Sequence, residues 1–375
     1  MNKYLRPTAL STSALAALAT MAALAPAAHA QQASGVTLYG TVDAAVEHLS
    51  SANATVNRMP GLTGGSAPSR LGFRGSEDLG GGLRAIFTLE QGISVDSGAL
   101  NQGGRAFGRQ AFVGLSGPWG AVTLGRQYSM LFWSQLDADI LGPAMFGSGS
   151  LDSYLPNARV DNALAYRGTF GGMTVGATYS LGRDAVNAGP SPAGTNCAGE
   201  SGTDSKACRQ WSLLAKYDTA QWGVSAAVDE IRGGAGAFAG LTSSALTDRR
   251  STVAGWAKWG DLKVGAGLIA RRNEGSAATP RSTLWYLGAA YPVSPQFVVD
   301  GEVFKLDYKN SANQATLFAL RGTYHLSKRT AVYAMAGRVS NDGSLALSVS
   351  NAAAGASPAA GGSQTGLGMG IRHTF

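Results

Sequence analysis

The residue types that most often carry redox or metal chemistry are scarce in this chain. It contains two cysteines, Cys197 and Cys208, with ten residues between them, and four histidines that lie in other segments. Two thiols this close can form a disulfide, or they can bind a metal if further ligands stand nearby. Because no histidine accompanies them, we predict a loop disulfide, no metal site and no other cofactor.

The short motifs of common enzyme classes are absent from the sequence as well. The chain has no H-E-x-x-H, no G-x-S-x-G and no G-x-x-x-x-G-K-[ST]. The stretch GAGLIA at 265–270 imitates a dinucleotide fingerprint, but it lies within an alternating segment and is followed by RRNEG rather than by a helix. We therefore expect no enzyme, while a hydrolase that assembles its serine, histidine and acid from separate strands stays open as an alternative.

Charge is the remaining chemistry, and arginine supplies much of it. Lysine and arginine number 30 against 23 acidic residues. The basic residues are spread over many segments rather than gathered in one patch, which argues against nucleic acid as a partner. Arg70, Arg74, Arg84 and Arg109 could simply pair with nearby acidic residues on a polar surface.

Short alternating segments recur along the chain and must position these charges. In GVTLYGTVDAAVEHL, for example, Val36, Leu38 and Val42 fall on one face, whereas Thr37 and Asp43 fall on the other. Such alternation is typical of strands with one apolar face. About sixteen such segments follow one another, and none reaches the roughly 18 apolar residues of a helical membrane span. The chain is therefore predicted to be all-β.

The connections between these segments alternate in length. Short turns such as GPWG, TFGG and SKR contrast with long stretches at 50–68, 129–158, 183–207, 233–247 and 341–362. Short turns at one end and long loops at the other are typical of an outer-membrane barrel. Only a closed barrel pairs every strand N–H and C=O within hydrocarbon. The sequence thus predicts a transmembrane antiparallel β-barrel whose lumen is a water channel or is plugged by a long loop.

Residues 1–30 have the features of a secretory signal peptide. Lys3 and Arg6 precede an Ala- and Leu-rich run that ends in AAHA, where Ala28 and Ala30 form an A-x-A site. We expect cleavage after Ala30, which leaves residues 31–375 as the barrel domain. A membrane anchor is the alternative, but the length and flanks of the segment disfavour it.

Several ordered motifs resemble one known family. The segments VTLYGTVDAAVEH, SRLGFRGSEDLGGGLRAIFTLEQG, GRQAFVGLSGPWGAVTLGRQY, NALAYRGTFGGMTVGATYSLG and GIRHTF look like the general diffusion porins of Gram-negative bacteria, most closely the β-proteobacterial type. The resemblance runs from about Gly35 to Phe375. It implies a homotrimer of sixteen-stranded barrels in the outer membrane, in contact with lipid and lipopolysaccharide. It also implies that a long third extracellular loop, about residues 129–158 here, folds into each lumen.

The same resemblance implies a ladder of wall arginines that faces acidic residues on this loop. Matching motifs place the pore-constriction arginines at Arg70, Arg109 and Arg159, with Arg74, Arg84 and Arg126 as further members. Asp137 and Asp139 are the expected acidic residues of the loop. The PEFGG of enteric porins reads PAMFG here, so that Ala144 stands where a glutamate would be. One missing acid should bias the pore toward anions.

We therefore expect a porin that passes small hydrophilic solutes and ions by passive diffusion, with a weak preference for anions. Arginine suits a crowded wall because it keeps its charge. The alternatives are a substrate-specific anion channel, an outer-membrane hydrolase and a soluble β-rich adhesin.

The chain ends in the alternating segment SQTGLGMGIRHTF. If this segment pairs with the one that begins near Gly35, the barrel closes without open edges. By resemblance, a terminal aromatic is also the signal read by the outer-membrane insertion machinery, so Phe375 is expected to serve both closure and assembly. Other aromatics near segment ends are expected at the membrane interface, namely Tyr128, Tyr166, Tyr179, Trp211, Trp222, Trp256, Trp259, Tyr291 and Tyr308.

Overall fold

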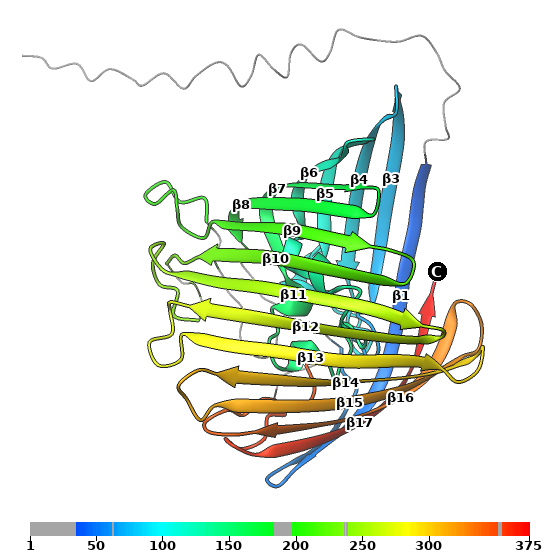
Figure 1. The fold of residues 1–375 in the computed structure, drawn as a ribbon, viewed down its shortest axis with the longest axis vertical. Helices are drawn as coiled ribbons and strands as arrows, with labels where there is room; N and C mark the ends of the chain where they lie inside the picture. The colour runs from blue at the N-terminus through cyan, green and yellow to red at the C-terminus, as the bar shows by residue number, and fades with distance from the viewer. Residues whose placement is uncertain are drawn as a thin grey trace, which may run out of the picture.

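The chain folds into one antiparallel sheet that closes on itself as a barrel (Figure 1). The computed structural model describes residues 35–61, 64–183, 197, 199–235, 237, 239–351 and 355–375. The predicted signal peptide lies outside the described residues. No helix in the described part of the chain combines the length and the apolar character needed to cross a membrane.

Seventeen strands make up the sheet within the described residues. They are β1 (Gly35–Ser51), β2 (Thr55–Arg58), β3 (Arg70–Gly80), β4 (Leu83–Gly92), β5 (Gln110–Gly117), β6 (Gly120–Tyr128), β7 (Arg159–Phe170), β8 (Met173–Arg183), β9 (Gln210–Asp218), β10 (Trp222–Arg232), β11 (Thr247–Trp259), β12 (Leu262–Asn273), β13 (Arg281–Pro292), β14 (Phe297–Tyr308), β15 (Gln314–His325), β16 (Thr330–Asn341) and β17 (Ser363–Thr374). The strand β2 is a four-residue piece within the first long connection. The other sixteen are the predicted alternating segments, so the predicted closed antiparallel barrel is confirmed.

The first and last strands form the seam of the barrel. β1 pairs with β17 from Thr41 opposite Thr374 to Ser51 opposite Gln364. The Phe375 N–H donates to the Gly40 carbonyl at 3.1 Å, and the Gly40 N–H donates to the Phe375 carbonyl at 3.0 Å. This pairing leaves no open sheet edge at the seam, which is the requirement for a sheet in hydrocarbon.

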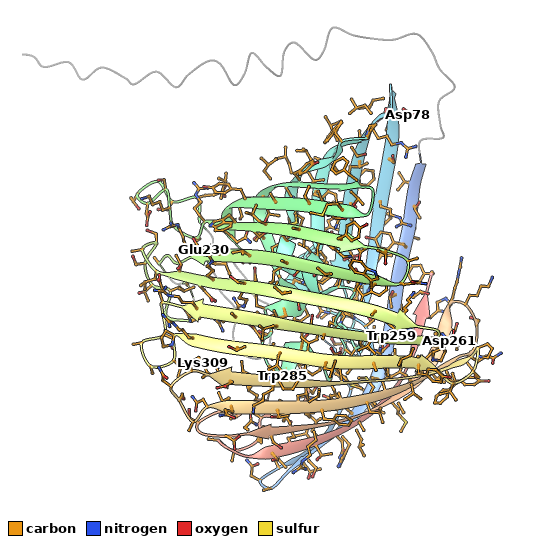
Figure 2. The ribbon with its side chains drawn as sticks, in the orientation of Figure 1. Asp78, Glu230, Trp259, Asp261, Trp285 and Lys309 are labelled. Carbon is orange, nitrogen blue, oxygen red and sulfur yellow. A yellow bond between two sulfur atoms is a disulfide. The ribbon has the colours of Figure 1, made fainter. Side chains whose placement is uncertain are left out.

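Alternation along the strands separates an apolar outer face from a polar inner face. On β1, Val36 and Leu38 are 65% and 54% exposed, whereas Asp43 is only 1% exposed. Figure 2 places Glu230 and Lys309 at the end with the long loops, and Trp259 and Asp261 at the end with the short turns. The outer face can therefore lie in lipid while the inner face carries the charged groups.

The connection from 129 to 158 contains α3 (Met130–Gln135), η2 (Ser148–Ser150) and η3 (Leu155–Asn157). A separate short helix, α2 (Asn101–Gly104), lies in the connection before β5. The Met130 N–H donates to the Ser212 hydroxyl at 2.9 Å, and the Tyr286 hydroxyl donates to Gln135 at 2.6 Å. Residues 129–158, called the inner loop below, thus pack against inward-facing side chains of the barrel wall.

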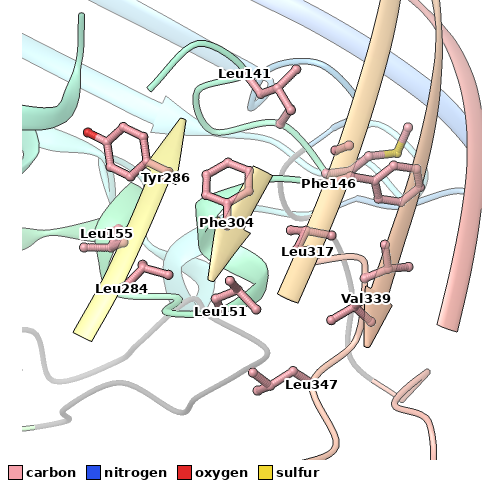
Figure 3. Close-up of a cluster of buried hydrophobic side chains, with 14 of the residues drawn as sticks. Leu141, Phe146, Leu151, Leu155, Leu284, Tyr286, Phe304, Leu317, Val339 and Leu347 are labelled. Carbon is pink, nitrogen blue, oxygen red and sulfur yellow. The ribbon is translucent and has the colours of Figure 1, made fainter. Parts of the chain in front are cut away.

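An apolar cluster joins the inner loop to one side of the wall (Figure 3). Phe146 and Leu151 of the loop are buried together with Phe304 of β14, Leu317 of β15 and Val339 of β16. Their burial removes apolar surface from water and fixes the loop on this half of the barrel. The charged groups of the opposite half, on β3 to β7, are left beside the remaining space.

Candidate functional site

Three of the predicted arginines meet around one carboxylate and one tyrosine hydroxyl. Arg109 donates to Glu90 at 2.7 Å through Nε, and to the Tyr128 hydroxyl at 2.9 Å through Nη2. Arg159 donates to the same hydroxyl at 2.6 Å, and Nε of Arg70 lies 3.6 Å from Glu90. These five residues are called the arginine cluster below.

Strand register brings the arginine cluster together. Arg70 begins β3 and lies opposite Gly92 of β4. The Arg109 N–H, just before β5, donates to the Glu90 carbonyl at 3.0 Å. Tyr128 ends β6 opposite Arg159, the first residue of β7. The cluster therefore forms where strands β3 to β7 meet their longer connections.

Tyr39 of β1 supports the carboxylate of the cluster from the neighbouring strand. Its hydroxyl donates to Glu90 at 3.0 Å. The ring lies over Gly72 of β3, where an added Cβ would be only 2.4 Å from Tyr39 Cζ. A glycine at this position is therefore required for the tyrosine ring to approach the wall.

The arginine cluster carries net positive charge. Its three guanidinium groups stay protonated, and Glu90 is its one carboxylate, so three minus one leaves an excess of two positive charges. Arg109 and Arg159 are only 7% and 2% exposed. Nε of Arg159 has no hydrogen-bond partner among the described residues. Low exposure reduces solvent screening, which strengthens the field of these charges.

The other three predicted arginines lie on the same wall but outside the cluster. Arg126 donates to Asp161 at 2.6 Å and forms an ion pair with it. Arg74 lies with its Cζ 5.3 Å from the centre of the Tyr39 ring. Arg84 lies opposite Asp78 in the β3–β4 hairpin, near the short turn. Arg74 and Arg84 therefore lie nearer the short turns than the cluster does, whereas Arg126, which donates to the Gly108 carbonyl next to Arg109, lies beside the cluster.

The two predicted acidic residues of the inner loop have other partners. Asp137 forms an ion pair with Lys216 of β9. Asp139 accepts hydrogen bonds from the Gly142 N–H and the Ser148 hydroxyl, both at 2.8 Å. Burial raises the pKa of the Asp139 carboxyl above its ordinary value, which disfavours its charged form. Within the described residues, neither acid forms an ion pair with the arginine cluster.

A third acidic residue of the inner loop is neutralised by the opposite wall. Arg250 of β11 donates to both carboxylate oxygens of Asp152, at 2.9 and 3.2 Å. The same arginine also donates to Asp248 at 3.0 Å. Two residues on from Asp152, the Tyr154 hydroxyl donates to Asp229 of β10. These contacts tether the loop to β10 and β11.

Sequence reasoning did not assign Tyr128 and Glu90 to the site. Tyr128 was expected at the membrane interface, but it is 5% exposed and stacks on Phe132 with ring centres 3.8 Å apart. Trp256 also differs from that expectation, since its indole N–H donates to the inward-facing Asp218 at 3.2 Å. A signal was present for Tyr128, which follows Arg126 by two residues and so tends to share its face.

The two cysteines are joined by a disulfide between Cys197 and Cys208. The Cys208 N–H also donates to the Gly233 carbonyl at 2.9 Å. The bond therefore lies where two of the long connections meet, at the end of the barrel opposite the short turns. It is remote in sequence from every member of the arginine cluster.

Known proteins match both the sequence and the fold. A family model described as Gram-negative porin matches residues 14–344. The outer membrane porin protein 32 of Delftia acidovorans is 31% identical over 96% of this chain and 99% of its own. Among solved structures, the anion-selective porin from Comamonas acidovorans has a TM-score of 0.73 at 26% identity, over 92% of this chain and 100% of its own. A trimer form of OmpT from Vibrio cholerae has a TM-score of 0.63 at 16% identity, over 92% and 100% of the two chains, and shows the fold alone.

Proposed function

The chain belongs to the Gram-negative porin family, and on this premise we propose that its arginine cluster sets the ion preference of an outer-membrane channel. The protein is a channel rather than an enzyme, and it resides in the outer membrane of a Gram-negative bacterium. Small hydrophilic solutes and ions pass through its lumen by passive diffusion. The anion-selective porin of Comamonas acidovorans supports a preference for anions.

One observation carries the assignment of this preference to the cluster. The arginine cluster has three guanidinium groups and one carboxylate, while the three acidic residues of the inner loop are engaged elsewhere. The positive charge of the wall therefore has few negative charges opposite it. This is the balance of fixed charges that favours an anion over a cation in a narrow aqueous passage.

The inner loop provides the narrowing that this mechanism needs. It is anchored by the apolar cluster on β14 to β16 and by the Arg250–Asp152 pair on β11. Solutes must then pass along β3 to β7, close to the arginines. Proximity matters because, at physiological ionic strength, dissolved salt largely screens a charge at distances beyond about 8 Å.

Reversal potentials across a planar bilayer under a KCl gradient test this proposal. The wild-type protein should give a reversal potential with the same sign as the chloride equilibrium potential. Replacing Arg109 and Arg159 together by glutamine should lower the chloride-to-potassium permeability ratio by roughly threefold to tenfold, because two charges near the passage are lost. Clear potassium selectivity of the wild type would contradict the assignment.

A matched control separates the cluster from total charge. The double variant Arg249→Gln/Arg281→Gln removes two positive charges from exposed positions at the start of β11 and β13, far along the sheet from the cluster. Its permeability ratio should equal that of the wild type. An equal loss of chloride preference in this control would mean that net charge, rather than the cluster, sets the sign.

A substrate-specific anion channel is the second candidate, and the close grouping of three arginines favours it. A general channel conducts in proportion to solute concentration, whereas a specific channel saturates. Current carried by one organic anion that saturates at low concentration, while others do not, would favour the specific channel.

We also propose that three copies associate. The trimer form of the Vibrio cholerae relative supports this state. A depression of about 570 Å³ on the outer face crosses β1 and β14 to β17, and Val46, Val332 and Ile371 line it with apolar surface. Chemical cross-linking in detergent should yield a trimer that heat dissociates, whereas a purely monomeric species would contradict the proposal.

A further inference from the structure

A cavity of about 380 Å³ lies on the inner face of β1 and β3 to β7, next to the arginine cluster. Tyr128 belongs to the cluster and also lines the cavity, and α3 covers one side with Met130 and Trp133. Cavities of this volume are in the range that binds small organic molecules.

Two arginines line this cavity without an acidic partner. Cζ of Arg167 lies 3.6 Å from the centre of the Trp133 ring, and Cζ of Arg74 lies 5.3 Å from the centre of the Tyr39 ring. Within the described part of the chain, neither guanidinium forms an ion pair or donates a hydrogen bond. This distinguishes them from Arg109, whose charge is offset by Glu90. Their N–H groups are free to bind an anion.

The rest of the lining is partly apolar. Ile86 and Phe112 offer aliphatic and aromatic surface, and the amide side chains of Gln110 and Gln127 lie beside them. A bare inorganic anion gains nothing from the apolar part of the lining. A molecule with a carboxylate at one end and a flat apolar ring at the other can use both parts.

We propose that this cavity binds single-ring aromatic carboxylates on their way through the channel. The proposal rests on the function proposed above, because the ligand enters through the same lumen. Arg167 holds the carboxylate, which accepts paired N–H groups from its guanidinium, and Arg74 adds positive charge to the same lining. The ring lies against Ile86 and Phe112, where an offset or edge contact with the aromatic ring of Phe112 is favourable.

The test uses the refolded protein and benzoate as the probe, with acetate and inorganic phosphate as comparisons. Calorimetry in detergent should detect benzoate binding at a concentration at which acetate and phosphate do not bind. In a planar bilayer, benzoate should reduce the chloride current to a plateau. Equal behaviour of benzoate and acetate would overturn the proposal, and tight phosphate binding would assign the cavity to inorganic anions instead.

Variants locate the effect in the cavity. Arg167→Gln and Phe112→Ala should each weaken benzoate binding by roughly tenfold or more, because each removes one of the two kinds of contact. Arg167→Lys should restore part of the affinity, which shows that a folded channel rather than a damaged one is measured. Arg281→Gln, remote from the cavity, should bind benzoate as the wild type does. Unchanged binding in both cavity variants would overturn the proposal.

The two proposals can fail separately. If the protein conducts chloride but binds benzoate no better than acetate, the cavity proposal fails and the channel stands. If the protein gives no conductance although benzoate binds in detergent, the channel function fails and the cavity site stands.

Discussion

Tyr128 and Glu90 both hold Arg109, but by different means. The Tyr128 hydroxyl accepts hydrogen bonds from Arg109 and Arg159 without offsetting their charge. Glu90 both accepts a hydrogen bond from Arg109 and neutralises one charge. A wall that combines the two can keep its arginines in place and still remain positive. The two residues should therefore respond differently to substitution.

Tyr128→Phe should lower stability and leave the sign of the ion preference unchanged. The ring can still stack on Phe132, but the two buried guanidinium groups lose their shared acceptor. The expected loss in the free energy of unfolding is about 1–3 kcal/mol. Urea unfolding followed by tryptophan fluorescence measures it. Tyr291→Phe, on the exposed outer face, is the control, and an unchanged midpoint for Tyr128→Phe would show that the hydroxyl does not hold the arginines.

Glu90→Gln should strengthen the anion preference. The amide can still accept a hydrogen bond from Arg109, but the excess of positive charge in the cluster rises because its one carboxylate is gone. The chloride-to-potassium permeability ratio should increase by a few-fold in reversal-potential measurements. Glu77→Gln is the control, because it removes the same negative charge from an exposed position of β3 outside the cluster. A shift toward potassium in Glu90→Gln would contradict the charge balance argued for the cluster.

At the scale of elements, the strands could be predicted but the partners of their side chains could not. Alternation in the sequence identified the sixteen long strands because each has one face in an apolar and one in a polar environment. The four-residue strand β2 lies within a long connection and has too few residues to show alternation. The partners of Asp137 and Asp139 could not be predicted from neighbouring residues. Lys216, the partner of Asp137, is distant in sequence, and the turn that encloses Asp139 forms only when the loop packs.

The ion pair between Asp152 and Arg250 gives a prediction about the inner loop as an element. Asp152→Ala leaves the nearly buried Arg250 with Asp248 alone and removes one tether of the loop. Leaving a buried charge without any partner costs about 3–5 kcal/mol, and the cost here should be smaller because Asp248 remains. The loop should therefore move more, and single-channel recordings should show more current noise than the wild type.

Asp261→Ala is the matched control for this loop variant. Asp261 lies in the exposed turn at the opposite end of the barrel wall (Figure 2). Its channels should be as quiet as those of the wild type. If Asp152→Ala is equally quiet, the apolar cluster alone holds the inner loop and the ion pair is dispensable.

At the scale of the whole molecule, the barrel interior is divided into two unlike halves. The inner loop and the apolar cluster fill the side of β14 to β16, and the arginine cluster and the cavity occupy the side of β3 to β7. A barrel of about sixteen strands is too wide to be filled by wall side chains alone, so space remains inside it beside the inner loop. Placing the loop on the apolar half leaves the charged half open to solutes. The division depends on a closed wall, and hence on the seam between β1 and β17.

Deletion of Phe375 should impair assembly far more than conduction. The residue exchanges two backbone hydrogen bonds with Gly40, and its ring lies so close that a Cβ on Gly40 would be 2.4 Å from Phe375 Cζ. Losing these contacts opens the short-turn end of the seam, where unpaired groups in lipid are costly. The refolding yield, measured by heat-modifiable mobility on gels, should fall severalfold. The channels that do form should keep the wild-type conductance, because the arginine cluster lies on other strands. Gly40→Val should give the same loss of yield by forcing the ring away, and Gly35→Val, on the same strand with open space around it, should not. Wild-type yields from both the deletion and Gly40→Val would mean that the seam is held by the longer pairing of β1 with β17 alone.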